Sequence, residues 1–325
     1  MLRALVCAYS EVGYRCLRVL LDAGVEVPLV FTHADAPDEQ RWFASVAELA
    51  RARAVAVCTE DPHAPPWPGR IAALAPHYLF CFYYRALLGP GLLASARWGA
   101  LNMHGSLLPR YRGRAPVNWA ILQGESQTGA TLHYMVQRPD AGAIVAQEAV
   151  PIGIDDTALD VSLAVAGAAA RLLGRCLPQL AAGPPAATPM DLERGSYFGG
   201  RRPEDGRIDF TWPALRVHNL IRAVAPPFPG AFAELGGGTR LRFAGSRWRG
   251  EPARHAALAP CLYAERGTLF VDCRDGVRLE LTGASLGGEW LDAARLERLS
   301  AAPLCLDPSV LQGNSDDEEV ADSRG

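Results

Sequence analysis

The chain has 325 residues, a formal net charge of −3, 49% hydrophobic residues and 21% charged residues. These values are typical of a globular protein that buries a sizeable core in one large or two modest domains, and they give no electrostatic footprint for nucleic acid. All 32 basic residues are arginine, which excludes reactions that need a lysine, such as Schiff-base catalysis and phosphate binding by a Walker A loop.

The cysteines and the lengths of the apolar segments indicate the cellular compartment in which the protein works. The eight cysteines form no C-x-x-C pair, and most of them lie in apolar segments. We expect buried free thiols in a reducing compartment. The sequence starts directly with a strand pattern, offers no signal-peptide core, and contains no apolar stretch of about 18 residues. We therefore expect a cytoplasmic protein without membrane insertion.

The first part of the chain alternates strand-like and helix-like segments. Strands are predicted at 2–8, 25–32, 54–58 and 77–84, and helices at 12–23, 45–53 and 67–74. This alternation predicts an α/β fold with a doubly wound, mostly parallel sheet. The first strand–helix turn has a single glycine, Gly13, and lacks G-x-G-x-x-G. The sheet is therefore Rossmann-like, but nothing indicates a nicotinamide cofactor.

A polar loop follows the apolar pair Ala100-Leu101. Asn102 and His104 are two residues apart, so in an extended segment their side chains leave on the same side. An amide donor and an imidazole could then converge on a carbonyl that gains negative charge, and the imidazole could move a proton. Asp140, in an Asp-Ala-Gly turn, is a candidate to fix the imidazole tautomer. By residue type alone, a loop histidine and a helix-capping aspartate are the more common situation.

The later part of the chain changes character. Strands at 129–136 and 143–150 and a helix at 157–180 complete the first domain, and a Gly/Pro/Ala-rich linker follows at 181–189. A helix at 213–225 then precedes short strands at 231–235, 239–243, 261–265, 268–273 and 277–281, a spacing that suggests a small barrel. We predict domains at 1–189 and 190–305 and a disordered acidic tail at 306–325.

Several motifs resemble one known family. Asn102-x-His104-x-Ser-Leu-Leu-Pro, then Tyr-Arg-Gly-x-x-Pro, and later Asp140-x-Gly resemble the signature of the 10-formyltetrahydrofolate-dependent formyltransferases. The resemblance covers about residues 1–305 and is strongest to the UDP-4-amino-4-deoxy-L-arabinose formyltransferases of polymyxin resistance. It implies a Rossmann-like domain, an OB-fold-like β-barrel, and formyl transfer from 10-formyltetrahydrofolate to the sugar's 4-amino group for lipid A modification. No metal is expected.

The resemblance also assigns residues. Asn102 would stabilise the oxyanion, His104 would move the proton, and Asp140 would keep His104 oriented and basic. The folate would contact Ala86, Leu87, Leu88, Arg114, Val136, Gln137, Arg138, Pro139 and Asp140. Arg112, Arg201 and Arg202 are candidates for the nucleotide's phosphates, since guanidinium forks suit phosphate. A solvated, charged surface loop is the alternative for these arginines.

Other interpretations stay open. The acceptor could be a different nucleotide-linked amino sugar or a charged initiator tRNA, although a tRNA enzyme should carry a basic face. A non-catalytic folate-binding protein could share the fold. We favour His133 as a structural histidine over a zinc ligand beside His104 and Asp140. A monomer or weak homo-oligomer is expected, with a separate decarboxylase protein supplying the preceding pathway step.

Overall fold

The computed structural model describes residues 1–34, 41–235 and 238–306, and the chain forms two compact units. Unit 1 comprises residues 1–120, 127–152 and 160–200, and unit 2 comprises residues 121–126, 153–159 and those from 201 onward. The chain therefore crosses between the units several times rather than at a single linker. Of the predicted acidic tail only Leu306 lies within the described residues. It is buried and donates its N–H to the carbonyl oxygen of Pro260 at 2.9 Å.

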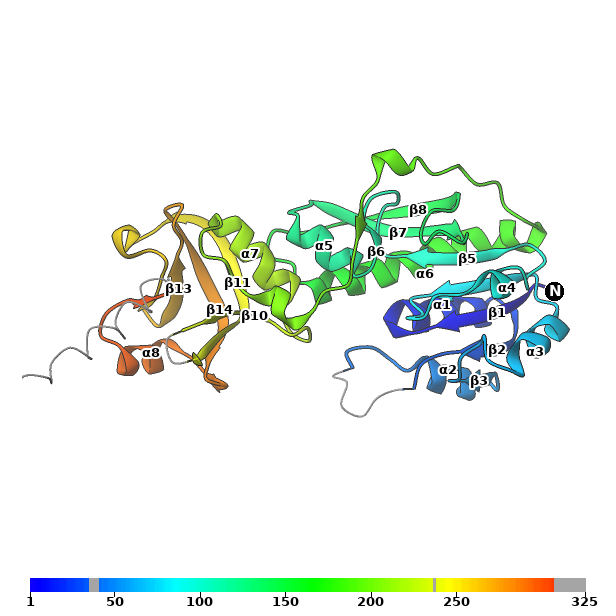
Figure 1. Cartoon of the computed structure of the whole chain (residues 1–325), viewed down its shortest axis with the longest axis horizontal. Helices are drawn as coiled ribbons and strands as arrows, with labels where there is room; N and C mark the ends of the chain where they lie inside the picture. The colour runs from blue at the N-terminus through cyan, green and yellow to red at the C-terminus, as the bar shows by residue number, and fades with distance from the viewer. Residues whose placement is uncertain (35–40, 236–237, 307–325) are drawn as a thin grey trace, which may run out of the picture. The chain divides into compact units, whose positions relative to one another are not determined.

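Unit 1 is built on a seven-stranded sheet in the order β3-β2-β1-β4-β5-β7-β8 (Figure 1). The pairs from β3 to β5 are parallel, whereas β5–β7 and β7–β8 are antiparallel. The order reverses beside β1, as in doubly wound sheets, and this confirms the predicted Rossmann-like fold. The bounds are β1 Arg3–Ala8, β2 Glu26–Phe31, β3 Ala56–Cys58, β4 Tyr78–Phe82, β5 Ala100–His104, β7 Gln127–Tyr134 and β8 Ile144–Pro151.

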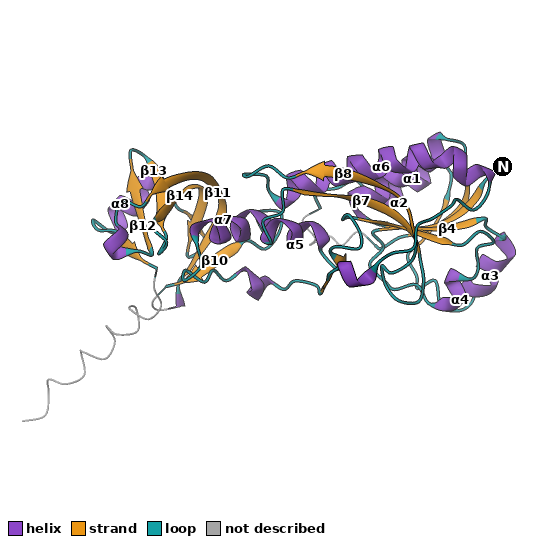
Figure 2. Cartoon of the chain, turned by 90° about the horizontal axis from the view of Figure 1, so that it is seen from above, coloured by secondary structure: helices purple, strands orange, loops and turns teal. Residues whose placement is uncertain are grey.

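Helices flank this sheet on both faces (Figure 2). Helix α1 buries Val12, Cys16 and Leu20, whose spacing places them on one side of the helix. Helix α2 begins after Ser45, whose side chain accepts the N–H of Glu48, a cap that stabilises a helix by about 1 kcal/mol. The bounds are α1 Ser10–Asp22, α2 Val46–Ala52, α3 Trp67–Leu74, α4 Pro90–Leu93, α5 Pro116–Leu122 and α6 Ala158–Ala182.

Helix α6 corrects the expectation that the chain contains no apolar stretch of about 18 residues. It has 25 residues and a mean hydropathy of 1.3 over an 18-residue window, so by length and composition it could cross a membrane. Half of that window is buried within the protein, through residues such as Val165, Leu172 and Leu180. Gly174 lies beside Val19 of α1, on one face of the sheet. This burial is that of a core helix.

Unit 2 contains a curled antiparallel sheet in the order β10-β11-β14-β13-β12-β16, with β15 paired to β14. Helix α7 packs its apolar side, including Val217, Leu220 and Ile221, into the core of this unit. The sheet forms half of a barrel, in agreement with the predicted barrel-like second domain. The bounds are α7 Ala214–Ala223, β10 Ala231–Glu234, β11 Arg240–Pro252, β12 Cys261–Glu265, β13 Thr268–Asp272, β14 Val277–Leu286, β15 Glu289–Trp290, α8 Ala293–Leu299 and β16 Leu304–Cys305.

Two strands of unit 2 are longer than the sequence indicated. β11 and β14 continue well past the predicted ends at Phe243 and Leu281. Their register shifts around Gly245, where a Cβ would lie 2.4 Å from Thr282 Oγ1. Such a bulge breaks the two-residue alternation by which strands are recognised. The predicted strands therefore ended before the bulge.

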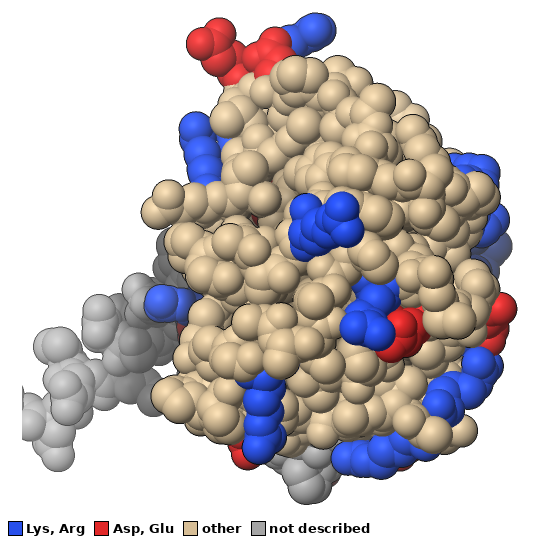
Figure 3. Space-filling model, turned by 90° about the vertical axis from the view of Figure 1, so that its right-hand side faces the viewer, with Lys and Arg blue, Asp and Glu red and all other residues tan. Residues whose placement is uncertain are grey.

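Short elements complete the described chain. The two-residue strands β6 (Arg112–Gly113) and β9 (Tyr197–Phe198) form a parallel pair in unit 1 that the sequence did not predict. Three 3₁₀ turns are η1 Leu192–Arg194, η2 Pro203–Gly206 and η4 Ala256–Leu258. On the face drawn in Figure 3, basic side chains stand singly or in small groups among uncharged residues.

Candidate active site

The predicted catalytic pair lies at the carboxyl end of β5, inside the sheet of unit 1. Asn102 and His104 alternate with Met103, so both side chains leave the same side of the strand. Pairing with β7 sets Asn102 opposite His133 and His104 opposite Thr131. The carboxyl edge of a doubly wound sheet is where such folds bind ligands, so this placement suits a reaction site.

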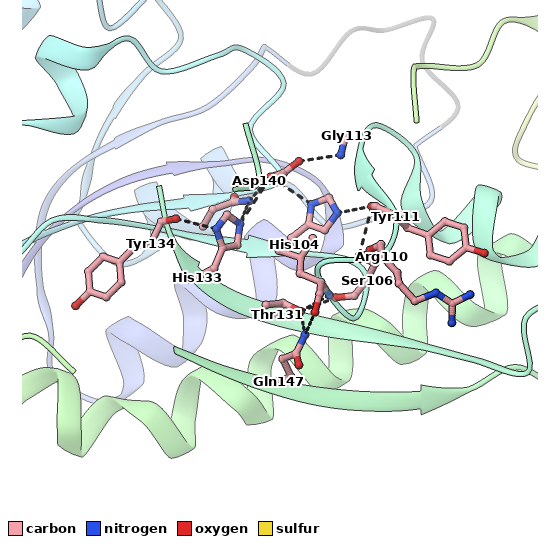
Figure 4. A network of polar contacts seen from close by, with 12 residues as sticks. His104, Ser106, Arg110, Tyr111, Gly113, Thr131, His133, Tyr134, Asp140 and Gln147 are labelled. Carbon is pink, nitrogen blue, oxygen red and sulfur yellow. Dashed lines mark hydrogen bonds and ion pairs between the residues drawn. The ribbon is translucent and has the colours of Figure 1, made fainter. Parts of the chain in front are cut away.

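Asp140 reaches this pair from the turn after β7, with a left-handed φ of 50°. Its Oδ2 accepts the N–H of Gly113 at 2.9 Å. Its Oδ1 lies 3.4 Å from Asn102 Nδ2 and 3.6 Å from His104 Nδ1 (Figure 4). The structure therefore brings together the three predicted catalytic residues. Gly142 permits the turn, because a Cβ there would lie 1.9 Å from the carbonyl oxygen of Tyr134.

The contacts of His104 decide which of its ring nitrogens is basic. Nε2 lies 2.8 Å from the carbonyl oxygen of Tyr111, so Nε2 carries a hydrogen and donates it. In the neutral ring Nδ1 then keeps its lone pair, facing Asp140 across 3.6 Å. A proton taken up at Nδ1 would be stabilised by the carboxylate. The shorter, orienting contact is thus made by a main-chain carbonyl, whereas the family resemblance assigned that role to Asp140.

His133 lies inside the same cluster. Its Nδ1 donates to the carbonyl oxygen of Tyr134 at 2.8 Å, and its Nε2 accepts from Asn102 Nδ2 at 3.1 Å. Burial, and then the neighbouring charge of His104, lower the pKa of His133 to about 4, so the ring is neutral at pH 7. The expected structural histidine has its hydrogen bonds satisfied, and it also fixes the amide of Asn102.

A second layer of side chains holds the loop that follows β5. Thr131 Oγ1 donates to the carbonyl oxygen of Ser106 at 2.6 Å, and Gln147 Nε2 donates to Thr131 Oγ1 at 2.9 Å and to the carbonyl oxygen of Leu108 at 2.8 Å. Ser106 Oγ donates to the carbonyl oxygen of Arg110 at 2.7 Å (Figure 4). Sequence reasoning missed this network. The alternation along β7 could have marked Thr131 as a buried polar position, whereas Gln147 is exposed and carries no such signal.

Tyr83 is another residue that the sequence analysis passed over. It follows β4 with a left-handed φ of 57°, and a Cβ on Gly105 would lie 1.7 Å from its hydroxyl oxygen. The hydroxyl therefore lies against the segment between His104 and Ser106. Burial raises the pKa of Tyr83, with the charge of Asp140 adding to the shift, so the hydroxyl keeps its hydrogen at neutral pH.

The predicted folate contacts lie on two loops beyond the carboxyl ends of β4 and β7. Within the described residues, the main-chain groups of Ala86, Leu87, Leu88, Val136 and Gln137 make no hydrogen bonds. Leu87 and Val136 are also exposed. Free main-chain donors and acceptors at this edge fit the edge of a pterin ring, which offers the complementary groups. Arg138 and Pro139 continue the second loop to Asp140.

The predicted arginines divide into three cases. Arg114 is exposed and lies against Gly200, whose Cβ would approach its guanidinium carbon to 3.7 Å. Arg112 is buried. Arg201 and Arg202 belong to unit 2, where Arg201 Nη2 donates to the carbonyl oxygen of Asp205 and the Arg202 N–H donates to the Asp205 carboxylate. The contacts of this last pair therefore fix a turn rather than join the catalytic cluster.

Two other features bear on the site. Among the described residues, no group of three or more His, Cys, Asp or Glu side chains could hold a metal ion, even where His104, His133 and Asp140 approach one another. A cleft of about 710 Å³ in unit 1 is lined by Met1, Leu2 and Val25, which precede β1 and β2. It therefore lies at the amino ends of the strands, away from the catalytic cluster.

Several solved structures share this fold. An N-formyltransferase from Helicobacter canadensis, in complex with folinic acid and dTDP-3-aminofucose, is 19% identical with a TM-score of 0.70, over 86% of this chain and 99% of that chain. The sugar 3-N-formyltransferase WlaRD, solved with dTDP and 5-N-formyl-THF, is 17% identical with a TM-score of 0.68, over 86% and 97%. A sugar N-formyltransferase from a Shewanella species is 20% identical with a TM-score of 0.61, over 77% and 100%.

The Rossmann-like sheet, the Asn-His-Asp cluster at its carboxyl edge and the curled second sheet define a class of group-transfer enzymes. A sequence model described as Formyl transferase matches residues 24–177, and one described as Formyl transferase, C-terminal domain, matches residues 201–295. Together the two matches span most of the chain, which belongs to the formyl transferase family. The predicted enzyme class is therefore confirmed.

Proposed function

We propose that this formyltransferase moves a formyl group from 10-formyltetrahydrofolate to the amino group of a nucleotide-linked amino sugar. The observation that carries the proposal is the convergence of Asn102, His104 and Asp140 at the carboxyl edge of the sheet. The family supports formyl transfer. The ligands of the fold relatives, folinic acid and dTDP-3-aminofucose in one of them, support the donor and the acceptor class.

The reaction needs one bond formed and one bond broken. The donor supplies a formyl group that is already activated on N10. The acceptor's neutral amine forms a bond to the formyl carbon, and the bond between that carbon and N10 breaks. His104 takes the amine proton at Nδ1, where Asp140 stabilises the new charge, and returns it to N10. The Tyr111 carbonyl holds the ring in place by accepting from Nε2.

Asn102 has one amide hydrogen to spare for the developing oxyanion. One hydrogen of Nδ2 is held by His133 Nε2 at 3.1 Å, and the other makes a long contact of 3.4 Å to Asp140. The longer and weaker contact is the one that a negatively charged substrate oxygen would replace. A neutral His133 suits this arrangement, because only a neutral ring can accept the first hydrogen.

The particular acceptor that we propose is UDP-4-amino-4-deoxy-L-arabinose, on the strength of the motif resemblance, which would place the enzyme in lipid A modification. A dTDP-linked amino sugar is the second candidate, because the Helicobacter relative is in complex with one. A tRNA acceptor has less support, given the net charge of −3 and the scattered basic side chains on the face drawn in Figure 3.

The test is release of tetrahydrofolate from 10-formyltetrahydrofolate with each acceptor in turn: UDP-4-amino-4-deoxy-L-arabinose, dTDP-3-aminofucose and charged initiator tRNA. We expect turnover with an amino sugar and none with tRNA. Turnover with tRNA alone would refute the acceptor class. Tight folate binding without turnover of any acceptor would refute the assignment of a catalytic site and favour a folate-binding protein.

A further inference from the structure

Arg112 is a largely buried arginine whose side chain makes no hydrogen bond or ion pair within the described residues. The residue is 5% exposed, and its Nε is buried with no hydrogen-bond partner. Within the described part of the chain, no carboxylate and no hydrogen-bond acceptor contacts its guanidinium. The two terminal nitrogens, Nη1 and Nη2, are not among the buried unpartnered atoms and therefore reach solvent. A guanidinium with a buried, unpartnered Nε and accessible Nη atoms is suited to an anionic ligand.

Hydrogen bonds hold the backbone on both sides of Arg112, so its side chain is buried in a well-defined loop. The N–H of Tyr111 donates to Ser196 Oγ at 2.8 Å, and the N–H of Arg112 donates to the carbonyl oxygen of Ser196 at 3.0 Å. The N–H of Arg114 donates to the carbonyl oxygen of Phe198 at 3.0 Å. The main-chain N–H groups of this loop make hydrogen bonds, whereas the Arg112 side chain makes none within the described residues.

The position of Arg112 links it to the catalytic residues. The preceding carbonyl, of Tyr111, accepts from His104 Nε2, and the following N–H, of Gly113, donates to Asp140. A shift of this loop would therefore change both the contact to His104 and the contact to Asp140. Gly113 cannot readily change, because it has a φ of 96° and a Cβ there would lie 2.2 Å from the carbonyl oxygen of Phe198.

The charge of the surrounding loop has one sign. Residues 106–124 contain three arginines, Arg110, Arg112 and Arg114, and no aspartate or glutamate. A segment of this kind attracts anions, and a guanidinium fork matches the paired oxygens of phosphate. A diphosphate carries more charge than any other part of a nucleotide-linked sugar.

We propose that Arg112 binds the diphosphate of the nucleotide-linked acceptor and thereby tightens the loop that holds His104 and Asp140. The identity of the acceptor rests on the proposed function, whereas the anion site rests on Arg112 itself. The carboxylates of the folate's glutamate are the other anion in the reaction, and separate binding measurements distinguish the two sources.

The experiment compares Arg112→Met with Arg110→Met, which removes the same charge from an exposed position two residues earlier. Thermal unfolding is followed alone and with inorganic pyrophosphate, and dissociation constants are measured for UDP, uridine and folinic acid. Without ligand, we expect Arg112→Met to melt no lower than the unaltered protein, because a buried guanidinium nitrogen without a partner is removed. UDP should bind Arg112→Met about tenfold more weakly or worse, with uridine and folinic acid unchanged. Pyrophosphate should stabilise the unaltered protein and Arg110→Met, but not Arg112→Met.

Three results would overturn the proposal: equal UDP affinity in Arg112→Met, an equal loss in Arg110→Met, or weaker folinic acid binding with UDP unaffected. If Arg112→Met does not fold, Arg112→Lys takes its place, since it keeps the charge and loses the fork. Weaker UDP binding with unchanged uridine binding then supports the proposal, and unchanged UDP binding refutes it.

The two proposals fail separately. If no amino sugar is formylated but UDP affinity still depends on Arg112, the anion site stands and the proposed function fails. If formylation proceeds while Arg112→Met keeps the KM of the sugar nucleotide and the affinity for UDP, only the anion site is wrong.

Discussion

Two buried arginines, Arg222 in unit 2 and Arg112 in unit 1, differ in how their guanidinium groups are satisfied. In unit 2, Arg222 Nε donates to Asn219 Oδ1 at 2.9 Å, and its Nη1 donates to the carbonyl oxygens of Gly153 and Asp156, each at 3.1 Å. In unit 1, Arg112 has no such partner among the described residues. A saturated guanidinium stabilises a fold, whereas an unsaturated one is available to a ligand.

The same contrast holds for the histidines. His218 of unit 2 makes contacts of 2.8 Å to Ser246 Oγ and 2.9 Å to the carbonyl oxygen of Ile154, so both of its ring nitrogens are engaged. His104 has one short contact and one of 3.6 Å to Asp140. Loose contacts around titratable groups are what a site needs to accept a substrate and move a proton. The comparison therefore assigns chemistry to His104 and a structural role to His218.

The largest effect should come from His104→Ala, followed by Asp140→Ala. We expect turnover of the amino-sugar acceptor to fall at least about a hundredfold in each, the usual contribution of a general base or its charged neighbour. The measurement is kcat for tetrahydrofolate release, with His218→Asn, a buried histidine of unit 2, as the control. Near-normal turnover in either site variant would remove that residue from the mechanism.

Arg222→Met should reverse the behaviour expected of Arg112→Met. It leaves an amide oxygen and two carbonyl oxygens without their donor, so unit 2 should lose about 3 kcal/mol of stability. Denaturant unfolding of the two variants side by side tests this. Equal stability losses in both would mean that Arg112 is a structural arginine, and the contrast between the units would fail.

His133 makes stability depend on pH. Burial lowers its pKa from 6.5 to about 4 in the folded protein, so between those values the unfolded chain binds more protons. Stability is therefore fully present above pH 6.5 and falls as the pH drops toward 4, by about 2 kcal/mol between pH 8 and pH 5. Unfolding of His133→Asn should lack this part of the decline. Parallel curves for the variant and the unaltered protein would show that His133 is not buried as neutral.

The smallest effects are expected for two tyrosine-to-phenylalanine variants, one of which should lower stability and the other kcat. Tyr263 in unit 2 donates to Asp272 Oδ1 at 3.0 Å, so Tyr263→Phe should cost about 1 kcal/mol of stability and leave kcat alone. Tyr83 lies against Gly105 in the site, so Tyr83→Phe should lower kcat about tenfold with little change in the melting temperature. The reverse pattern would contradict the division of roles between the units.

Local elements followed from local signals. The helix predicted at 67–74 matches α3, Trp67–Leu74, and the strand predicted at 261–265 matches β12, Cys261–Glu265. Segments of this kind depend mainly on the local spacing of apolar residues, which the sequence shows directly. The two long strands of unit 2 were cut short, because bulges interrupt the alternation that defines a strand.

The sequence by itself determined that Asn102 and His104 share one side of a strand end, because side chains alternate along any strand. It also determined, through its motifs, that Asp140 belongs with them. Only the tertiary structure decided that the Tyr111 carbonyl orients His104, that His133 completes the cluster and that Arg112 is buried without a partner. These outcomes depend on strand order, on register and on the β6–β9 pair, which join residues as many as 85 positions apart, as in the bond from Tyr111 to Ser196. No local spacing encodes contacts of that range.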